Sequence, residues 1–317
     1  MSNEKIAYLF QGQGTQHTGM DLKSDPETKE LLRLADERLG FPFSKICLEG
    51  SEDELRKTIN AQPAVYIASC ASLLAGRSAL ESAGLNNPSF VVGHSLGQIT
   101  AMWAAGCISF SDGIFLTRRR GELMQEFSEK NPGGMIAIIG LGKVAIKKIC
   151  GAIGFEIANY NSPKQIVICG SKERLKEARE LALKGGATAA IILNTGGAFH
   201  SGAMEAIAPG IAEALGRIEL HDPRISIVAN TTARPLLSVY DIKKECENQI
   251  WWPVQWEESI EFMLGQGVNL FLEIGPSRVF ARLIKEIYKN VEIKHIEDCV
   301  KERKQEQQKA LLQPNLL

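Results

Sequence analysis

Short apolar runs alternate along the first part of the chain with longer amphipathic stretches, which predicts an α/β protein. The runs at residues 6–10 and 90–92 are expected to form buried strands, and so is a later run at 271–274. Helical periodicity covers residues 99–105 and 112–126. A further helix is expected to open at residues 62–68, with Pro63 in its first turn.

A different pattern begins after the break Asn131-Pro132-Gly133-Gly134. It predicts, in order, strand 135–141, helix 144–153, strand 155–160, a turn at 161–163, strand 165–169, helix 172–184 and strand 188–193. The order β-α-β-β-α-β is typical of the split βαβ unit. We therefore expect this unit, residues 131–194, to be inserted between two parts of a larger domain, residues 1–130 and 195–300.

The last residues, 301–317, form a tail rich in charge and glutamine, and it is expected to be a solvated end that takes no part in chemistry. The pattern leaves open whether this tail is helical or disordered.

Composition narrows the classes of function. The 317 residues are 44% hydrophobic and 23% charged, as in a globular protein with a large core. Lys and Arg number 36 and Asp and Glu 37, so the net charge of −1 argues against a nucleic-acid partner. We expect no membrane partner, because no apolar run reaches about 18 residues and no secretory signal precedes the first strand.

The seven cysteines are scattered, odd in number and free of any C-x-x-C pair. We therefore expect reduced thiols and a cytoplasmic location. The cysteines and histidines show no metal-ligand spacing, so no metal site is expected.

The most specific chemical signal is Gly93-His94-Ser95-Leu96-Gly97. Glycines two residues before and two after a serine, with a strand ahead and a helix behind, are typical of a nucleophile elbow. Ser95 is therefore predicted to be the nucleophile of an acyl transfer. The alternative is a purely structural strand–turn–helix corner.

A serine nucleophile requires a base, and the chain has five histidines. The side chain of His94 is expected to point away from Ser95. His200 lies in a glycine-rich loop between a strand-like and a helix-like run, where α/β enzymes place catalytic loops. Spacing thus favours His200 over His221 and His295, although a lone histidine is more often structural.

Beyond these residues, the chain resembles the malonyl-CoA:acyl carrier protein transacylases of fatty-acid synthesis and the discrete acyltransferases of polyketide pathways. The resemblance covers about residues 5–290, with eight motifs in the family's order. The motifs stand here as Phe10-Gln11-Gly12-Gln13-Gly14-Thr15-Gln16, Gln62-Pro63-Ala64, Gly93-His94-Ser95-Leu96-Gly97, Arg120-Gly121-Glu122-Leu123-Met124, Asn159-Tyr160-Asn161-Ser162-Pro163, Gly197-Ala198-Phe199-His200-Ser201, Pro253-Val254-Gln255-Trp256 and Glu273-Ile274-Gly275-Pro276.

The resemblance implies an α/β-hydrolase-like large domain with an inserted ferredoxin-like subdomain, and an active site in the cleft between them. Ser95 would be the nucleophile and His200 its base. A backbone carbonyl near Gln249 would orient the histidine in place of the usual carboxylate. The backbone amides of Gln13 and Leu96 would form the oxyanion hole.

The same resemblance implies three residues that select the acyl group. Arg120 would bind the free carboxylate of malonyl with two parallel hydrogen bonds, although it could instead belong to a surface run, Arg118–Arg120. Gln62 is expected to line the same pocket. The ring of Phe199 would leave no room for an α-methyl group, a preference worth about 1–3 kcal/mol.

The implied reaction is a ping-pong transfer of malonyl from malonyl-CoA, through an ester of Ser95, to the phosphopantetheine thiol of a holo acyl carrier protein. No metal or redox cofactor is expected. Two alternatives remain open: an acyl hydrolase that clears stalled carrier proteins, and a non-catalytic docking partner of a synthase. Fatty-acid and polyketide pathways are not distinguished, although a polyketide role is slightly favoured.

Three positions depart from the family's pattern. Gln11 stands where proline is usual, and we expect it to loosen the turn before the Gln13 amide. Gln98 replaces a glutamate, which removes a negative charge near the start of the helix after Ser95. Trp252 replaces a commonly polar residue before Pro253.

Overall fold

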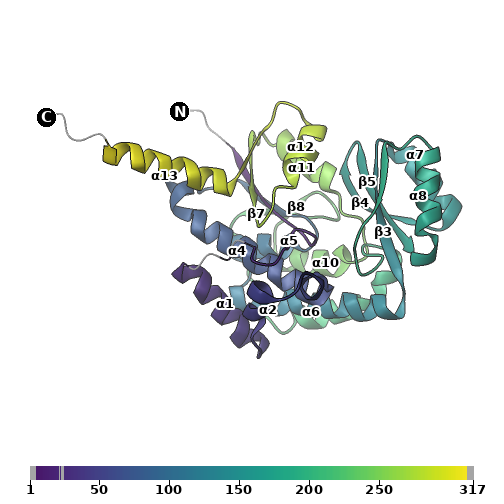
Figure 1. The fold of residues 1–317 in the computed structure, drawn as a ribbon, viewed down its shortest axis with the longest axis horizontal. Helices are drawn as coiled ribbons and strands as arrows, with labels where there is room; N and C mark the ends of the chain where they lie inside the picture. Colours follow the sequence, from purple (N-terminus) through teal and green to yellow (C-terminus); the bar gives the residue numbers. More distant parts are fainter. Residues whose placement is uncertain (1–4, 21, 23–24, 313–317) are drawn as a thin grey trace.

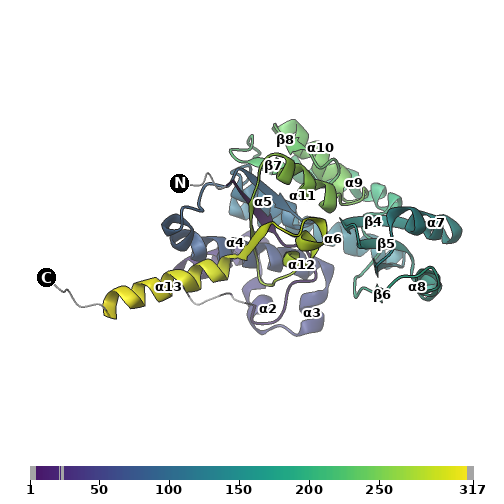
Figure 2. The same cartoon turned by 90° about the horizontal axis from the view of Figure 1, so that it is seen from above.

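The computed structural model of the chain describes residues 5–20, 22 and 25–312. These residues form a large sheet and a small sheet that lie side by side, each covered by helices (Figures 1 and 2). The α/β class expected from the sequence is confirmed.

The elements of the first part of the chain are β1 (Ile6–Phe10), α1 (Pro26–Leu39), α2 (Phe43–Glu49), α3 (Glu52–Arg56), α4 (Thr58–Ser82), β2 (Phe90–Gly93), α5 (Gly97–Ala104) and α6 (Phe110–Lys130). The middle part contains β3 (Gly133–Ile139), α7 (Lys143–Ile153), β4 (Glu156–Ser162), β5 (Gln165–Ser171), the 3-10 helix η1 (Lys172–Arg174), α8 (Leu175–Lys184) and β6 (Ala189–Ile192). The last part contains the 3-10 helix η2 (Gly202–Ile207), α9 (Ala208–Leu215), β7 (Ser226–Val228), β8 (Pro235–Leu236), α10 (Val239–Gln249), α11 (Trp256–Gly265), β9 (Leu270–Ile274), α12 (Phe280–Ile287), β10 (Glu292–His295) and α13 (Ile296–Leu312).

The large sheet has the strand order β10-β9-β1-β2-β7-β8 among the described residues. β1 lies between β2 and β9 and pairs with both in parallel, with Phe10 opposite Gly93 on one side and Ile274 on the other. The carboxyl ends of these three strands therefore meet at one edge. Open α/β sheets place their binding sites at that edge.

Both faces of the large sheet are buried, as is usual for parallel strands. Side chains alternate along β1: Ile6, Tyr8 and Phe10 pack in one core with α1, α4, α5 and α6. Ala7 and Leu9 pack in a second core, under α11 and α12. The continuous apolar sequence of β1 thus reflects a strand with helices on both sides.

The small sheet is antiparallel, with the order β4-β5-β3-β6. The chain order β3-α7-β4-β5-α8-β6 is the split βαβ unit expected from the sequence. Ile136 and Ile138 pack with the helices α7 and α8. Met135 and Ala137, on the other face of β3, pack with Phe199 of the large part. The second face of the small sheet is therefore directed at the large sheet's helices and loops.

Several boundaries differ from the sequence-based expectation by a few residues. The strand expected at 135–141 is β3, Gly133–Ile139, and the helix expected at 172–184 begins with the 3-10 turn η1. Two further differences change where a proline and a turn lie. α4 begins at Thr58, so Pro63 lies inside the helix rather than in its first turn. The carbonyl of Lys57 accepts the amides of Asn60 (2.8 Å) and Ala61 (2.8 Å) and so starts the helix earlier. β4 continues to Ser162, so the turn before β5 lies at 163–164 rather than at 161–163.

The end of the chain forms the helix α13, which packs on α4 near Gly76 and then projects from the body (Figure 1). This resolves the choice between a helix and a disordered end for residues 301–312; residues 313–317 lie outside the described part. No helix among the described residues combines the length and the apolar content required to cross a membrane.

The close approach between β2 and α5 makes a stability prediction. A Cβ on Gly93 would lie 1.8 Å from the carbonyl carbon of Gly97. That carbon belongs to the backbone, so it cannot rotate away as the end of a side chain can. Gly93→Ala is therefore expected to lower the free energy of unfolding by about 3 kcal/mol or more. The measurement is chemical denaturation, with the exposed helical Gly151→Ala as control, because nothing lies within 4 Å of its Cβ position. Equal stabilities for both variants would contradict this account.

Candidate active site

Ser95 lies at a sharp turn between the end of β2 and the start of α5, at the carboxyl edge of the large sheet. Its φ of +52° is in the left-handed region, which a residue with a side chain rarely adopts. Gly93 and Gly97 allow the strand and the helix to pass within contact of each other. The geometry is that of the nucleophile elbow predicted from the sequence.

Two side chains hold the strained backbone of Ser95. The Ser95 amide donates to Oδ1 of Asn230 (2.7 Å), and the Ser95 carbonyl accepts from Nε2 of Gln249 (2.7 Å). Asn230 also donates to the carbonyl of Gly93 (2.7 Å). The sequence analysis did not select Asn230, although a polar residue just past the end of the buried strand β7 was a usable signal.

His200 is placed next to Ser95, with 2.8 Å between its Nε2 and the serine Oγ. On the other side of the ring, Nδ1 lies 2.7 Å from the backbone carbonyl of Gln249. Because a carbonyl only accepts, Nδ1 carries the hydrogen and Nε2 is free to accept the serine proton. The carbonyl near Gln249 that the sequence analysis expected is thus at the histidine.

The electrostatic surroundings keep His200 uncharged. Burial, and next the positive charge of Arg120, lower the pKa of His200 from 6.5 to about 3. The imidazole is therefore neutral, and able to accept a proton, through the ordinary range of pH.

Arg120 is buried beside the serine, with 4% of its surface exposed. Its guanidinium donates to Oε1 of Gln62 (2.8 Å), to Oγ of Ser95 (3.1 Å) and to Oε1 of Gln249 (3.0 Å). All three partners are neutral, and within the described residues no carboxylate lies within ion-pair distance of it. Burial lowers the pKa of Arg120 from 12.5 to about 10, which leaves it cationic at neutral pH. Arg118 and Arg119, by contrast, pair with Glu122.

A cavity of about 170 Å³ opens in front of these groups, between the large part and the small sheet. Ser95, His200, Arg120 and Gln13 line it. The small sheet and the segment that follows it contribute Met135, Asn159, Asn161, Val167 and Leu193, and Phe199 lies beside them. The remaining lining residues come from the large part and the connections to it, and they include Arg56, His94 and Met124. Gln62 lies behind Arg120 rather than on the cavity wall.

The two expected oxyanion-hole residues flank the elbow. Leu96 directly follows Ser95, and Gln13 lies in the turn after β1. That turn packs against the elbow, because a Cβ on Gly12 would be 2.6 Å from the His94 carbonyl. Neither the Leu96 nor the Gln13 amide has an acceptor among the described residues.

The other histidines lie away from the serine hydroxyl. His94 also lines the cavity, but its Nε2 contacts Oδ1 of Asn161 (2.9 Å) and its ring packs on Trp256, so it makes no hydrogen bond with the serine hydroxyl. His221 is exposed beside Glu219, and His295 contacts the carbonyl of Ser277. In the described part of the chain, no group of three or more His, Cys, Asp or Glu side chains is arranged to hold a metal ion.

Of the three positions that depart from the family's pattern, Gln98 and Gln11 form buried hydrogen bonds. Gln98 accepts from the Asn230 amide (3.2 Å) and from Nε2 of Gln249 (3.2 Å) behind the serine. Gln11 donates to Oε1 of Glu273 (2.7 Å) and accepts from the Ser277 amide (3.0 Å). The expectation that Gln11 loosens its turn is therefore wrong, because its side chain fastens that turn. Trp252 is 42% exposed beside Trp251.

Comparison with known proteins agrees with this geometry. Residues 7–315 match the family described as the acyl transferase domain. The malonyl CoA-acyl carrier protein transacylase of Bacillus subtilis is 37% identical, over 93% of this chain and 94% of that protein. A polyketide biosynthesis malonyl CoA-acyl carrier protein transacylase of the same organism, PksC, is 36% identical over 90% and 98%.

A solved structure of a malonyl-transacylase in complex with a holo type II polyketide synthase acyl carrier protein superposes with a TM-score of 0.86, at 34% identity, and covers 92% of this chain and 96% of that one. Because the family match and these relatives span nearly the whole sequence, the chain belongs to the acyl transferase family, among the malonyl-CoA:acyl carrier protein transacylases.

Proposed function

We propose that this chain transfers a malonyl group from malonyl-CoA to the phosphopantetheine thiol of an acyl carrier protein. The observation that carries this proposal is the buried Arg120, a cation beside the nucleophile with only neutral partners. A buried charge is costly without an opposite one. An acyl group that ends in a carboxylate supplies that charge and binds a guanidinium through two hydrogen bonds.

In the first half-reaction, Ser95 becomes acylated. Nε2 of His200, 2.8 Å from Oγ, takes the hydroxyl proton as the oxygen attacks the thioester carbonyl carbon. The amides of Gln13 and Leu96 would bind the oxyanion of the tetrahedral intermediate. The carbon–sulfur bond then breaks, and His200 returns the proton to the CoA sulfur.

The second half-reaction runs the same steps toward the carrier. The phosphopantetheine thiol gives its proton to His200 and attacks the malonyl-serine carbonyl. The bond to Oγ breaks, and His200 reprotonates the serine. The Gln249 carbonyl holds the ring in one orientation throughout, at 2.7 Å from Nδ1. The proposed chemistry calls for no metal or redox cofactor.

The size and lining of the cavity support a short acyl group. About 170 Å³ holds a malonyl unit but not a long fatty acyl chain. Phe199 and Met124 form an apolar part of the wall, and we propose that the Phe199 ring disfavours an α-methyl substituent. Residues 131–194 are proposed to act as the subdomain that closes the second side of this cavity.

The carrier-protein partner is supported by the relatives, one of which was solved with a holo acyl carrier protein. One relative is named simply as a malonyl CoA-acyl carrier protein transacylase and another as a polyketide biosynthesis enzyme, and the proposed reaction is the same for both. We also propose a cytoplasmic location, because the seven cysteines are free thiols and reduced thiols are typical of that compartment.

The first prediction from the proposed function concerns the covalent intermediate. Brief exposure to malonyl-CoA should add one malonyl group to the wild-type chain and none to Ser95→Ala, as measured by intact mass. The adduct should persist in buffer and leave when holo acyl carrier protein is added. An adduct that disappears in buffer alone would favour an acyl hydrolase. No adduct at all would favour a non-catalytic docking role.

The second prediction concerns the acyl selectivity of Arg120. Arg120→Ala should lower the rate of malonyl loading by about 100-fold or more, because the malonyl carboxylate would lose its buried partner. Acetyl loading should stay equal or rise. The matched control is Arg119→Ala, since Arg119 pairs with Glu122 and does not line the cavity. Equal losses with both acyl groups would mean that Arg120 is structural.

The third prediction concerns pH. Only neutral His200 can accept the serine proton, and its pKa is lowered to about 3 in the free enzyme. The kcat/KM for malonyl loading should therefore stay level from about pH 8 down to about pH 5, rather than fall below the ordinary histidine value of about 6.5. Stopped-flow release of CoA across this range is the measurement. An inflection near pH 6.5 would show that the pKa of His200 is not lowered, and would contradict this account.

A further inference from the structure

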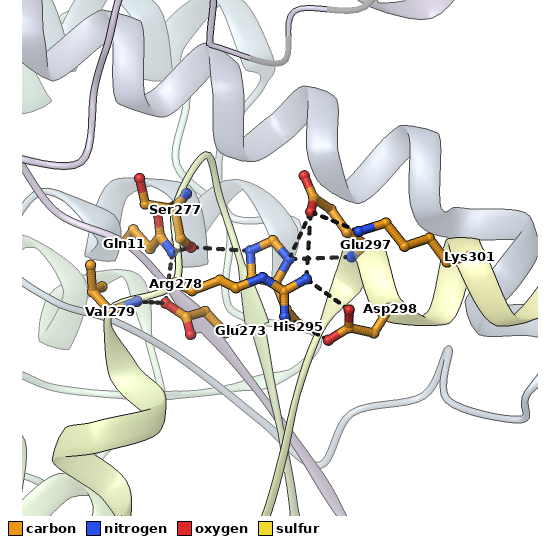
Figure 3. A network of polar contacts seen from close by, with 9 residues as sticks. All are labelled: Gln11, Glu273, Ser277, Arg278, Val279, His295, Glu297, Asp298 and Lys301. Atoms are coloured by element: carbon orange, nitrogen blue, oxygen red, sulfur yellow. Dashed lines mark hydrogen bonds and ion pairs between the residues drawn. The ribbon is translucent and has the colours of Figure 1, made fainter.

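A network of hydrogen bonds joins the turn after β1 to the loop between β9 and α12 (Figure 3). The turn, residues 11–15, contains Gln13, and the loop contains Ser277. This network lies outside the cavity and is not part of the chemistry described above.

Ser277 forms hydrogen bonds with both ends of the turn. At its start, the Gln11 side chain accepts from the Ser277 amide (3.0 Å) and donates to the Ser277 carbonyl. At its end, the Ser277 hydroxyl donates to the carbonyl of Thr15 (3.0 Å). Gln13 is therefore two residues from each of two anchored positions.

Further hydrogen bonds hold Gln11 and the Ser277 carbonyl in place. Oε1 of Glu273 accepts from Nε2 of Gln11 (2.7 Å) and from the amide of Val279 (2.6 Å). Nε2 of His295 contacts the Ser277 carbonyl at 3.0 Å, on the side toward α13 (Figure 3). Gln11 has no exposed surface, and Glu273 only 1%, so water cannot readily replace these bonds.

The opposite side of the turn lies against the elbow. A Cβ on Gly97 would meet the Gln11 carbonyl at 2.7 Å, and one on Gly12 would meet the His94 carbonyl at 2.6 Å. The turn therefore packs between the elbow and the Ser277 loop. Without the hydrogen bonds to Ser277, the turn and the Gln13 amide within it would be free to move away from Ser95.

We infer that Gln11 and Ser277 are positioning residues that hold the Gln13 amide in the oxyanion hole. This rests on the proposed function, in which that amide stabilises the tetrahedral intermediate. Neither residue touches the substrate. Their effect is on the rate of the chemical steps, because a misplaced donor costs transition-state stabilisation and not ground-state binding.

The experiment compares three variants of the full chain. Gln11→Met keeps the length of the side chain and removes its hydrogen bonds. Ser277→Ala removes only the hydroxyl bond to Thr15, and this smaller change tests the inference even where the first variant fails to fold. Arg278→Gln is the matched control: its residue is next in the chain, but its side chain pairs with Asp298 and Glu297, away from the turn.

The readouts are kcat and KM for malonyl transfer, the single-turnover rate of malonyl-serine formation, and the thermal midpoint. Gln11→Met should lower kcat and the single-turnover rate about 10- to 100-fold, and Ser277→Ala about 3- to 10-fold, with KM within about twofold. Arg278→Gln should match the wild type. Rates are measured well below each thermal midpoint and per active site, so that a loss of folded protein is not counted.

Folded Gln11→Met or Ser277→Ala with wild-type kcat would overturn the inference, as would equal losses in Arg278→Gln. A rise in KM with unchanged kcat would also overturn it, because that result indicates a binding role. The proposed function is tested separately by the wild type: if the wild type forms no malonyl-serine, the proposed function fails, whereas normal loading with unaffected variants removes only the positioning role.

Discussion

The parallel pairing of β1 with β2 on one side and β9 on the other is the constraint on which the rest of the site depends. Each strand ends at the same edge, and each is followed by a segment that the chemistry requires. β1 leads to the turn with Gln13, β2 to the elbow with Ser95, and β9 to the loop with Ser277. Burial of both sheet faces fixes the register of these strands, so the three segments have little freedom relative to one another.

The site contains two energetically unfavourable features, a strained backbone and a buried charge, and the surrounding fold stabilises both. Ser95 and His200 have φ angles of +52° and +60°. At Ser95, hydrogen bonds with the side chains of Asn230 and Gln249 help to maintain this conformation. Arg120 is a buried cation held by neutral oxygens. Its charge helps to keep His200 neutral, and a substrate carboxylate would compensate it. Nucleophile, base and selectivity are therefore coupled through one guanidinium.

Gln249 shows how much of this arrangement depends on a single residue. Its backbone carbonyl orients His200, and its side chain contacts both Arg120 and the Ser95 carbonyl. The sequence analysis assigned only the carbonyl, and it did so through the resemblance. Residues so far apart in the chain give no local signal of contact, because their meeting depends on how α10 packs beside the elbow.

The sequence by itself determined the features that depend on local pattern. Glycine spacing around Ser95 predicted the elbow, since only glycine permits such close backbone approach, and hydrophobic periodicity predicted both the α/β class and the β-α-β-β-α-β order. The tertiary structure alone decided which distant groups meet: the clamp of Asn230 on Ser95, the position of Gln62 behind Arg120, and the fastening of Gln11 to Ser277, which the sequence had suggested would be a loose turn. The physical reason is that a side chain's hydrogen-bond partners across more than 100 residues are set by strand order and helix packing, which no local pattern encodes.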